Sequence, residues 1–367
     1  MLYMLLYPLR EHVSWLNIMG YISFRSAAAA ITALLITFFL GPYIIRALKH
    51  YHIGETIRHD GPASHHAKAG TPTMGGLIIH LAVFVPTLLW ADLSNRYVLL
   101  VMFVTIWMGA IGFIDDYLKV VKKMKKGLVA RYKLAGQVII GLIVALFMYL
   151  YPSDPTLITA TSLPFLKNVM VNFGVFYAPF VILYITGFSN AVNLTDGLDG
   201  LASGLMALSA IALLFISYLS GRVDFSYYLG ILYLPDIGEL TVFLSAMLGG
   251  LVGFLWFNSR PAEVFMGDTG SLAYGAALGV VAIILKKEII FLLIGMVFVI
   301  EALSVVLQVG WFRHTKRRFG EGRRLFKMAP LHHHFEQSGW PESKIVIRFW
   351  IMGILCALMS LVTFKIQ

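Results

Sequence analysis

The residues that could carry out chemistry gather in four short polar segments of an otherwise apolar chain. They are Asp115 and Asp116 in FIDDY (113–117), Asn193, Asp196 and Asp199 in NLTDGLDG (193–200), Asp268 in FMGDTG (265–270), and His332, His333 and His334 in APLHHHFE (329–336). Carboxylates that meet lysines and histidines can support magnesium-assisted phosphoryl transfer, because Mg²⁺ binds one or two carboxylates together with substrate phosphates. The chain has no G-x-x-x-x-G-K-[ST] loop, so nucleotide hydrolysis is not predicted.

The adjacent Asp115 and Asp116 follow the apolar GAIGFI at the end of a predicted helix. Neighbouring residues of a helix point about 100° apart, so the two carboxylates fan out rather than chelate from one face. One can hold a cation while the other faces a second group, such as a lysine. A solvated helix end is the alternative, but acidic side chains at a helix C-terminus oppose its dipole, which favours a functional role.

Asp268 allows two interpretations. It precedes a predicted helix, where Asp or Thr is a favoured N-cap, and its carboxylate is equally suited to bind a metal ion. Gly267 and Gly270 let the backbone approach a ligand closely, which favours the ligand. The polar residues of NLTDGLDG exceed what one helix cap requires, so we expect the surplus to bind something.

The three consecutive histidines lie in a strongly basic segment. On a helix they could not all face one point, whereas an extended segment would bring the first and third together. Zinc is one possible ligand, but no cysteine lies nearby and zinc sites usually need four organised ligands. Contact with phosphate, or relay of a proton, suits the imidazoles better.

Composition predicts a membrane protein. Of 367 residues, 59% are hydrophobic and 13% are charged, and the mean hydropathy is +0.79, which excludes a soluble globule. A bilayer core requires roughly 20 apolar residues in a helix, and ten stretches approach this length. They are residues 22–45, 73–90, 97–114, 134–151, 171–188, 201–219, 240–257, 271–285, 289–312 and 345–364. We therefore expect an all-α polytopic membrane protein of about ten transmembrane helices, in a single domain over residues 1–367.

Lysine and arginine favour cytoplasmic loops, which predicts the orientation. The loops after odd-numbered stretches hold 20 of the 29 such residues, at 46–68, 119–133, 260 and 313–344. That side also carries the four polar segments, so we expect the active-site loops to be cytoplasmic and both termini periplasmic. The eighth stretch is short and the ninth is long, and one of them is expected to break or tilt.

Five segments together resemble one enzyme family. They are TPTMGG (71–76), GFIDDY (112–117), NLTDGLDGLA (193–202), FNSRPAEVFMGDTGSLA (257–273) and APLHHHFE (329–336). In this order, along essentially the whole chain, they resemble the phospho-N-acetylmuramoyl-pentapeptide transferase (MraY) family of the polyprenyl-phosphate N-acetylhexosamine-1-phosphate transferase superfamily. The resemblance implies that undecaprenyl phosphate attacks the sugar-proximal phosphate of UDP-N-acetylmuramoyl-pentapeptide in the bacterial cytoplasmic membrane. Lipid I and UMP are the implied products, in the first membrane step of peptidoglycan synthesis.

The resemblance also implies roles for individual residues. Asp268 would be the principal Mg²⁺ ligand, Asp115 or Asp116 a base or a metal neighbour, and His332 a catalytic group. The residues implied around the pyrophosphate and the metal are Lys68, Thr73, Lys119, Lys133, Asn193, Asp196 and Asn258, those implied for uridine are Gly197, Leu198, Asp199 and Phe265, and those implied near the phosphates are His332, His333 and His334. A magnesium-dependent homodimer and a polyprenyl groove beside a bent ninth stretch are further implications.

Two other functions compete with this interpretation. Glu301 and Gln308 lie inside the ninth stretch, and an intramembrane ionisable residue is functional by default, which supports a secondary transporter of an anionic solute. Transporters, however, place binding groups near the midplane between inverted repeats, and no repeat is apparent here. The second competitor is the sister transferase that uses UDP-N-acetylglucosamine. The net charge of +10 fits anionic lipids or an anionic substrate, and no nucleic-acid module is visible.

Overall fold

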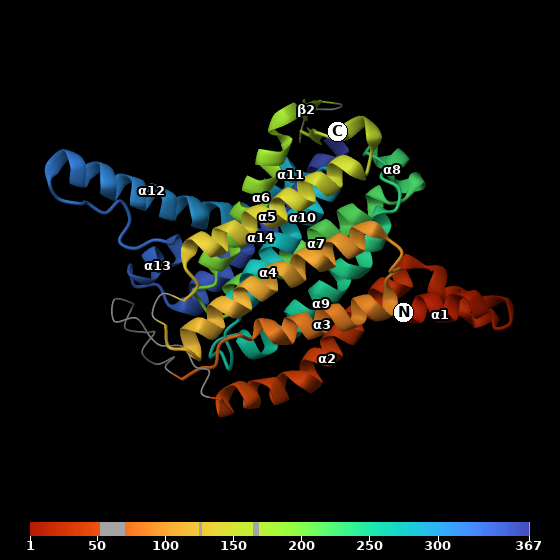
Figure 1. The fold of residues 1–367 in the computed structure, drawn as a ribbon, viewed down its shortest axis with the longest axis horizontal. Helices are drawn as coiled ribbons and strands as arrows, with labels where there is room; N and C mark the ends of the chain where they lie inside the picture. The colour runs from red at the N-terminus through yellow and green to blue at the C-terminus, as the bar shows by residue number, and fades with distance from the viewer. Residues whose placement is uncertain (52–69, 125–126, 164–168, 367) are drawn as a thin grey trace.

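The computed structural model describes residues 1–51, 70–124, 127–163 and 169–366. Within this part, nine helices are long and apolar enough to cross a membrane. They are α2 (Ile22–His50), α4 (Arg96–Val120), α5 (Ala130–Leu150), α6 (Tyr177–Thr195), α7 (Leu201–Ser220), α9 (Leu240–Asn258), α10 (Gly267–Ile284), α12 (Met296–Phe319) and α14 (Glu342–Ile366). A shorter apolar helix, α3 (Gly76–Trp90), packs with them in the bundle of Figure 1.

Short elements connect or precede these helices. They are α1 (Leu2–Leu6), α8 (Val223–Leu229), α11 (Glu288–Ile294), α13 (Leu331–Glu336) and the 3-10 turns η1 (Tyr7–Glu11), η2 (Ser14–Gly20), η4 (Pro155–Leu157), η5 (Gly174–Phe176) and η6 (Ile237–Glu239). The strands of the described residues, β1 (Ala160–Ser162) and β2 (Met170–Asn172), form one antiparallel hairpin in which Thr161 faces Val171. The predicted all-α fold class is confirmed.

Two of the predicted stretches, the ninth and the fifth, differ in how well they match the helices that the structure forms. The ninth breaks as expected, because α11 ends at Ile294 and α12 begins at Met296 on either side of Gly295. The predicted start of the fifth stretch at residue 171 was wrong, since that residue lies in β2 and α6 begins only at Tyr177. Asn172 Oδ1 accepts a hydrogen bond from the backbone of Gly174, whose positive φ of 51° turns the chain before the helix begins.

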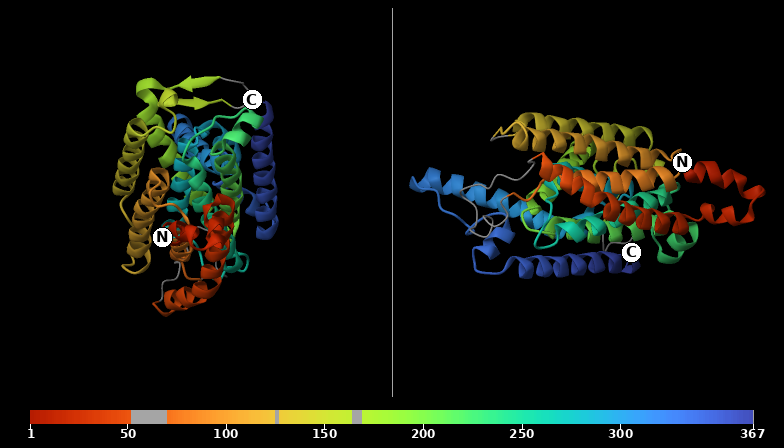
Figure 2. Two further views of the ribbon diagram at one scale, coloured as in Figure 1. Left: turned by 90° about the vertical axis from the view of Figure 1, so that its right-hand side faces the viewer. Right: turned by 90° about the horizontal axis from the view of Figure 1, so that it is seen from below.

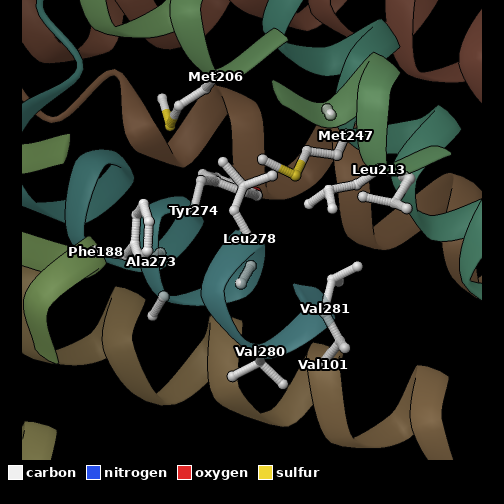
Figure 3. Close-up of a cluster of buried hydrophobic side chains, with 14 of the residues drawn as sticks. Val101, Phe188, Met206, Leu213, Met247, Ala273, Tyr274, Leu278, Val280 and Val281 are labelled. Atoms are coloured by element: carbon white, nitrogen blue, oxygen red, sulfur yellow. The ribbon is translucent and has the colours of Figure 1, made fainter. Parts of the chain in front are cut away.

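The helix α10 forms the centre of the bundle. Almost all of its residues are buried, and it packs against α4, α6 and α7. Figure 3 shows Leu278 and Val281 of this helix among apolar side chains from its neighbours, including Val101 and Phe188. A helix that is apolar all round must be covered on every side, so the start of α10 is held by the helices around it.

Polar groups from several helices meet where α10 begins. α4 and α6 end there while α5 begins there, as the contacts described below establish. Figures 1 and 2 show both chain termini toward the opposite end of the bundle, and α12 projecting beyond the bundle near α13. The expectation that the four polar segments gather at one end is therefore confirmed, while the side of the membrane on which they lie stays a prediction.

Candidate active site

The N-terminus of α10 is capped by a carboxylate from another helix. Asp116, near the end of α4, accepts hydrogen bonds from Asp268 N at 3.2 Å, Thr269 N at 2.9 Å and Thr269 Oγ1 at 2.7 Å. The two backbone N–H groups belong to the first turn of α10, where N–H groups have no partner within their own helix. A negative charge at this end is favoured by the helix dipole. Asp116 thus offsets the dipole of α10, although it opposes that of α4.

Two glycines allow this close approach. A Cβ atom at Gly112 of α4 would collide with the backbone oxygen of Asp268, and one at Gly76 of α3 would collide with the backbone of Gly270. Since both positions are glycine, α3 and α4 pack directly against the first turn of α10.

Asp268 does not cap its own helix. Its Oδ1 accepts a hydrogen bond from Asn193 Nδ2 at 2.6 Å, and its Oδ2 accepts from Lys133 Nζ at 2.9 Å and Lys119 Nζ at 3.1 Å. Asn193 also donates to Ser271 Oγ at 2.9 Å, which fixes the amide against α10. The cap alternative for Asp268 was therefore wrong, because Asp116 fills that role and the Asp268 carboxylate faces side chains of α4, α5 and α6.

Asp115 shares both lysines with Asp268. Its Oδ2 lies 2.9 Å from Lys119 Nζ and 3.4 Å from Lys133 Nζ, and its Oδ1 accepts from Leu128 N at 2.7 Å. The Asp115 side chain is only 4% exposed, whereas that of Lys119 is 38% exposed. The predicted divergence of the aspartate pair is confirmed: Asp115 faces lysines and Asp116 faces a helix end.

This arrangement suits a divalent cation. Two nearly buried carboxylates, Asp115 and Asp268, attract the same two ammonium groups, so the space between them favours positive charge. Among the described residues no three His, Cys, Asp or Glu side chains form a metal site by themselves. Mg²⁺ does not require one, because it is commonly held by one or two carboxylates with water and substrate phosphates.

A second segment lies against the start of α10. Phe265 N donates to Pro72 O at 2.8 Å, and Gly75 N donates to Phe265 O at 2.8 Å, so TPTMGG and FMGDTG pair side by side. A Cβ atom at Gly267 would lie 2.6 Å from Asp116 Oδ2 and 3.0 Å from Thr73 Oγ1. Thr73 therefore lies close to Asp116, and the backbone of Phe265 is held against the segment that carries Thr73, whereas Lys68 falls outside the described residues.

The loop of residues 196–200, between α6 and α7, is held by the buried polar side chain of Asn258. Asn258 is buried and accepts from Gly200 N at 3.2 Å and Ser203 Oγ at 2.8 Å, while its Nδ2 donates to Val264 O at 3.0 Å. Its amide is thus engaged on both sides by protein groups. Leu198 is buried in the apolar core.

Asp199 is anchored by a residue that the sequence did not single out. Asp199 N donates to Glu342 Oε1 at 3.0 Å, and Glu342 Oε2 pairs with Arg260 NH1 at 2.6 Å. Ala262 N donates to Asp199 Oδ2 at 3.3 Å. Glu342 is buried in the first turn of α14, where the helix dipole alone would account for an acidic residue, so its sequence position offered no signal.

The histidines lie on the short helix α13, where the ring centroids of His332 and His333 are 4.2 Å apart. His332 is fully buried and contacts Glu301, with 3.2 Å between His332 Nδ1 and Glu301 Oε2. His333 Nδ1 lies 3.2 Å from Glu336 Oε2, and His334 Nδ1 accepts from the backbone of Lys327 at 3.1 Å. The helical interpretation therefore holds, and the three rings have separate partners.

The structure thus brings six of the seventeen predicted site residues into one cluster. Those in direct contact with one another around the start of α10 are Asp115, Asp116, Lys119, Lys133, Asn193 and Asp268. Asp196 and Gly197 follow directly after α6, and a Cβ atom at Gly197 would collide with His332 Nε2, so His332 joins the site through this loop. Four residues outside the predicted set support the predicted site residues, either by direct contact or, for Arg260, through Glu342: Thr269, Glu301, Arg260 and Glu342.

Known proteins match the chain over its full length. A model of glycosyl transferase family 4 matches residues 98–286, and signature 1 of phospho-N-acetylmuramoyl-pentapeptide-transferase matches residues 68–79. The phospho-N-acetylmuramoyl-pentapeptide-transferase of Gemmatimonas aurantiaca is 52% identical over 380 residues, and that of Thermodesulfovibrio yellowstonii is 51% identical over 367, with 100% of each chain covered in both cases. The protein of the same name from Chlorobaculum parvum is 53% identical over 352 residues, covering 96% of this chain and 95% of the relative. The resemblance inferred from the five segments is confirmed.

Proposed function

Because the chain belongs to the phospho-N-acetylmuramoyl-pentapeptide-transferase family, we propose that it transfers phospho-N-acetylmuramoyl-pentapeptide from its UDP-linked donor to undecaprenyl phosphate. The products are lipid I and UMP. The observation that carries the proposal is the cluster around Asp268, where two lysines and one amide from three helices converge on one carboxylate at a helix N-terminus. Such a cluster fits a reaction between charged phosphates.

The reaction exchanges one phosphoanhydride for another. An oxygen of undecaprenyl phosphate forms a bond to the sugar-proximal phosphorus of the donor, and the bond from that phosphorus to the bridging oxygen breaks. UMP leaves with the electron pair. No separate energy source is required, because a new phosphoanhydride bond replaces the one that breaks. Direct attack is the simpler route, because a lipid phosphate is already a competent nucleophile and needs no covalent enzyme intermediate.

The chain's own residues hold and neutralise these phosphates. Lys119 and Lys133 carry the positive charge that a pyrophosphate requires, and their pairing with Asp115 and Asp268 keeps both ammonium groups inside the site. Asn193 fixes the orientation of the Asp268 carboxylate. Asp116 holds the first turn of α10 and therefore the backbone that carries Asp268.

Magnesium is part of the proposal. Asp268 and Asp115 would hold the ion, since their carboxylates face one another across the two lysines. When bound, Mg²⁺ would neutralise negative charge on the pyrophosphate of the donor. Thr73, Asp196, Lys68 and Asn258 belong to the same proposed surroundings.

The UDP part of the donor is assigned to the loop after α6. Gly197, Leu198, Asp199 and the ring of Phe265 would contact uridine, with Phe265 stacking on uracil. His332, His333 and His334 would lie near the phosphates. The buried support of Asp199 by Glu342 favours this assignment, because a loop that must recognise a ligand is held in one conformation.

The membrane arrangement follows from the charge distribution. We assign the active site to the cytoplasmic face of the bacterial inner membrane and both termini to the periplasm, because lysine and arginine favour the loops at the active-site end. The donor is a water-soluble anion and the acceptor lies in the bilayer, so a site at this interface serves both. A homodimer is proposed from the family resemblance, and light scattering of the purified protein would test it.

Release of UMP tests the proposed function. Purified, detergent-solubilised protein is given undecaprenyl phosphate, magnesium and each UDP-sugar in a separate reaction, with a control that lacks the lipid phosphate. Lipid-dependent release from UDP-N-acetylmuramoyl-pentapeptide alone is the expected result. Release from UDP-N-acetylglucosamine instead would assign the chain to the sister transferases, and release from neither would reopen the anion transporter.

A further inference from the structure

One face of α12 carries polar side chains that bind the chain segment returning from its far end. Glu301, Gln308 and Thr315 are spaced seven residues apart, which places them along one face of the helix. Figure 1 shows α12 projecting from the bundle and the following chain running back toward α13. Each of the three side chains binds a different part of residues 323–332.

Thr315 and Gln308 bind only backbone groups of the returning segment. Thr315 Oγ1 accepts from Arg323 N at 2.9 Å, and Gln308 Oε1 accepts from Leu325 N and Phe326 N, each at 2.9 Å. Gln308 Nε2 returns a bond to Phe326 O at 3.1 Å. These contacts account for the path of the returning segment and require no further function.

Glu301 differs because it also binds a side chain. Its Oε1 accepts from His332 N at 3.1 Å, and its Oε2 lies 3.2 Å from His332 Nδ1. Both side chains are almost fully buried, with 0% exposure for Glu301 and 1% for His332. The bond from His332 N would be enough to hold the backbone of the returning segment. The contact between Glu301 Oε2 and the imidazole therefore requires its own explanation.

The second contact decides which nitrogen of His332 carries the proton. A carboxylate can only accept, so the imidazole must present Nδ1–H to Glu301. In the neutral ring the lone pair then lies on Nε2, and this nitrogen is buried without a hydrogen-bond partner among the described residues. Nε2 is aimed at Gly197, since a Cβ atom there would collide with it.

A buried ring nitrogen that is aimed at this loop needs a hydrogen-bond partner that the described residues do not supply. We propose that Glu301 is a positioning residue that acts through His332: it keeps the proton on Nδ1 and presents the Nε2 lone pair beside Gly197 to an N–H or O–H group of the bound UDP-linked donor. This inference rests on the proposed function. It also explains why an acidic residue lies inside a membrane-spanning helix, where an unpaired charge would be costly.

The variant Glu301→Gln tests the inference while keeping the shape of the side chain. The glutamine oxygen can still accept from His332 N, but its NH₂ group would face Nδ1, which must then give up its proton to Nε2. We expect kcat/KM for the UDP-linked donor to fall by roughly 10- to 100-fold, the range seen when a group that orients a metal-binding histidine is removed. The thermal unfolding midpoint and the KM for undecaprenyl phosphate should stay as in the wild type.

A double-mutant cycle separates positioning from simple support of the fold. If Glu301 acts through His332, Glu301→Gln should cause no further loss of kcat/KM for the donor in a His332→Ala background. Gln308→Ala is the matched control on the same helix face, and its effect should multiply with that of His332→Ala. If the effects of Glu301→Gln and His332→Ala also multiplied, the proposal would be overturned.

A spectroscopic measurement keeps the inference testable if His332→Ala is inactive or misfolds. In protein labelled with ¹⁵N-histidine, the His332 ring should be protonated at Nδ1 in the wild type and at Nε2 in Glu301→Gln. A wild-type ring protonated at Nε2 alone would overturn the proposal. Wild-type protein that releases no UMP would contradict the proposed function instead, and the ring measurement would still decide between the two tautomers.

Discussion

Asp116 of α4 accepts two hydrogen bonds from Thr269 of α10, at 2.9 Å from the backbone nitrogen and 2.7 Å from the hydroxyl. One membrane helix thus supplies the cap of another. Its neighbour Asp115 faces two lysines instead, so adjacent carboxylates of the same type have different environments. This difference predicts that the two aspartates respond differently to the same substitution.

Asp116→Asn should destabilise the protein more than Asp115→Asn does. Every contact of the Asp116 carboxylate comes from a donor, and an asparagine NH₂ group would face one of these donors with another. Loss of a buried cap that accepts charge-assisted bonds costs about 2 kcal/mol. Thermal unfolding in detergent should therefore show a clearly lower midpoint for Asp116→Asn. Equal midpoints for the two variants would contradict the capping role.

Asp268→Asn should abolish UMP release without unfolding the protein. Asparagine keeps the shape of the side chain, but it removes the negative charge that holds Lys119 and Lys133 and that would bind Mg²⁺. Asn193→Ala is the informative comparison, because it removes the bond that orients Asp268 and the bond to Ser271 but keeps the carboxylate, and it should leave part of the turnover. Near-normal turnover of Asp268→Asn at ordinary magnesium concentration would refute the assignment.

Lys133→Met should lower turnover and strengthen binding of divalent cations. The ammonium group lies 2.9 Å from Asp268 and 3.4 Å from Asp115, so it competes with an added cation for these carboxylates. Removing it leaves two nearby negative charges that, among the described residues, Lys119 alone compensates. Binding of Mn²⁺ measured by electron paramagnetic resonance provides the readout, with Lys122→Met as the control. Unchanged or weaker Mn²⁺ binding would exclude a cation site between Asp115 and Asp268.

Glu342→Gln should weaken binding of the UDP-linked donor and leave the chemical step unchanged. The substitution removes the buried charge that pairs with Arg260, and the remaining glutamine oxygen accepts more weakly from Asp199 N, so the loop before α7 is held less firmly. We expect the KM for the donor to rise by about 10-fold, because a charge-assisted bond contributes about 1.5 kcal/mol or more. The KM for undecaprenyl phosphate serves as an internal control, and a change confined to kcat would argue against a role in donor binding.

The ten apolar stretches and the meeting of the polar segments at one end could be predicted from the sequence, because both depend on length and composition. Contacts between distant residues could not. The partner amides of Asp116 lie about 150 residues away, and no local pattern indicates which helix end faces it. Glu301 was identified as unusual from its place in an apolar helix, but its pairing with His332 depends on the path of the returning segment.

Gly197→Ala should strongly lower activity although it adds only one methyl group. The new Cβ atom would collide with Nε2 of His332, and Glu301 holds that ring in place from the other side, so the collision cannot be relieved by rotation of the imidazole alone. Either the loop of residues 196–200 or the ring must move away from the bound donor. We expect kcat/KM to fall by roughly 100-fold, as a displacement of about 1 Å in a catalytic site can cause. Gly310→Ala in α12 is the matched control, because nothing lies within 4 Å of its added Cβ atom and its activity should match that of the wild type. If Gly197→Ala kept wild-type activity, His332 would not face this loop during turnover, and the proposed role of its Nε2 would have to be abandoned.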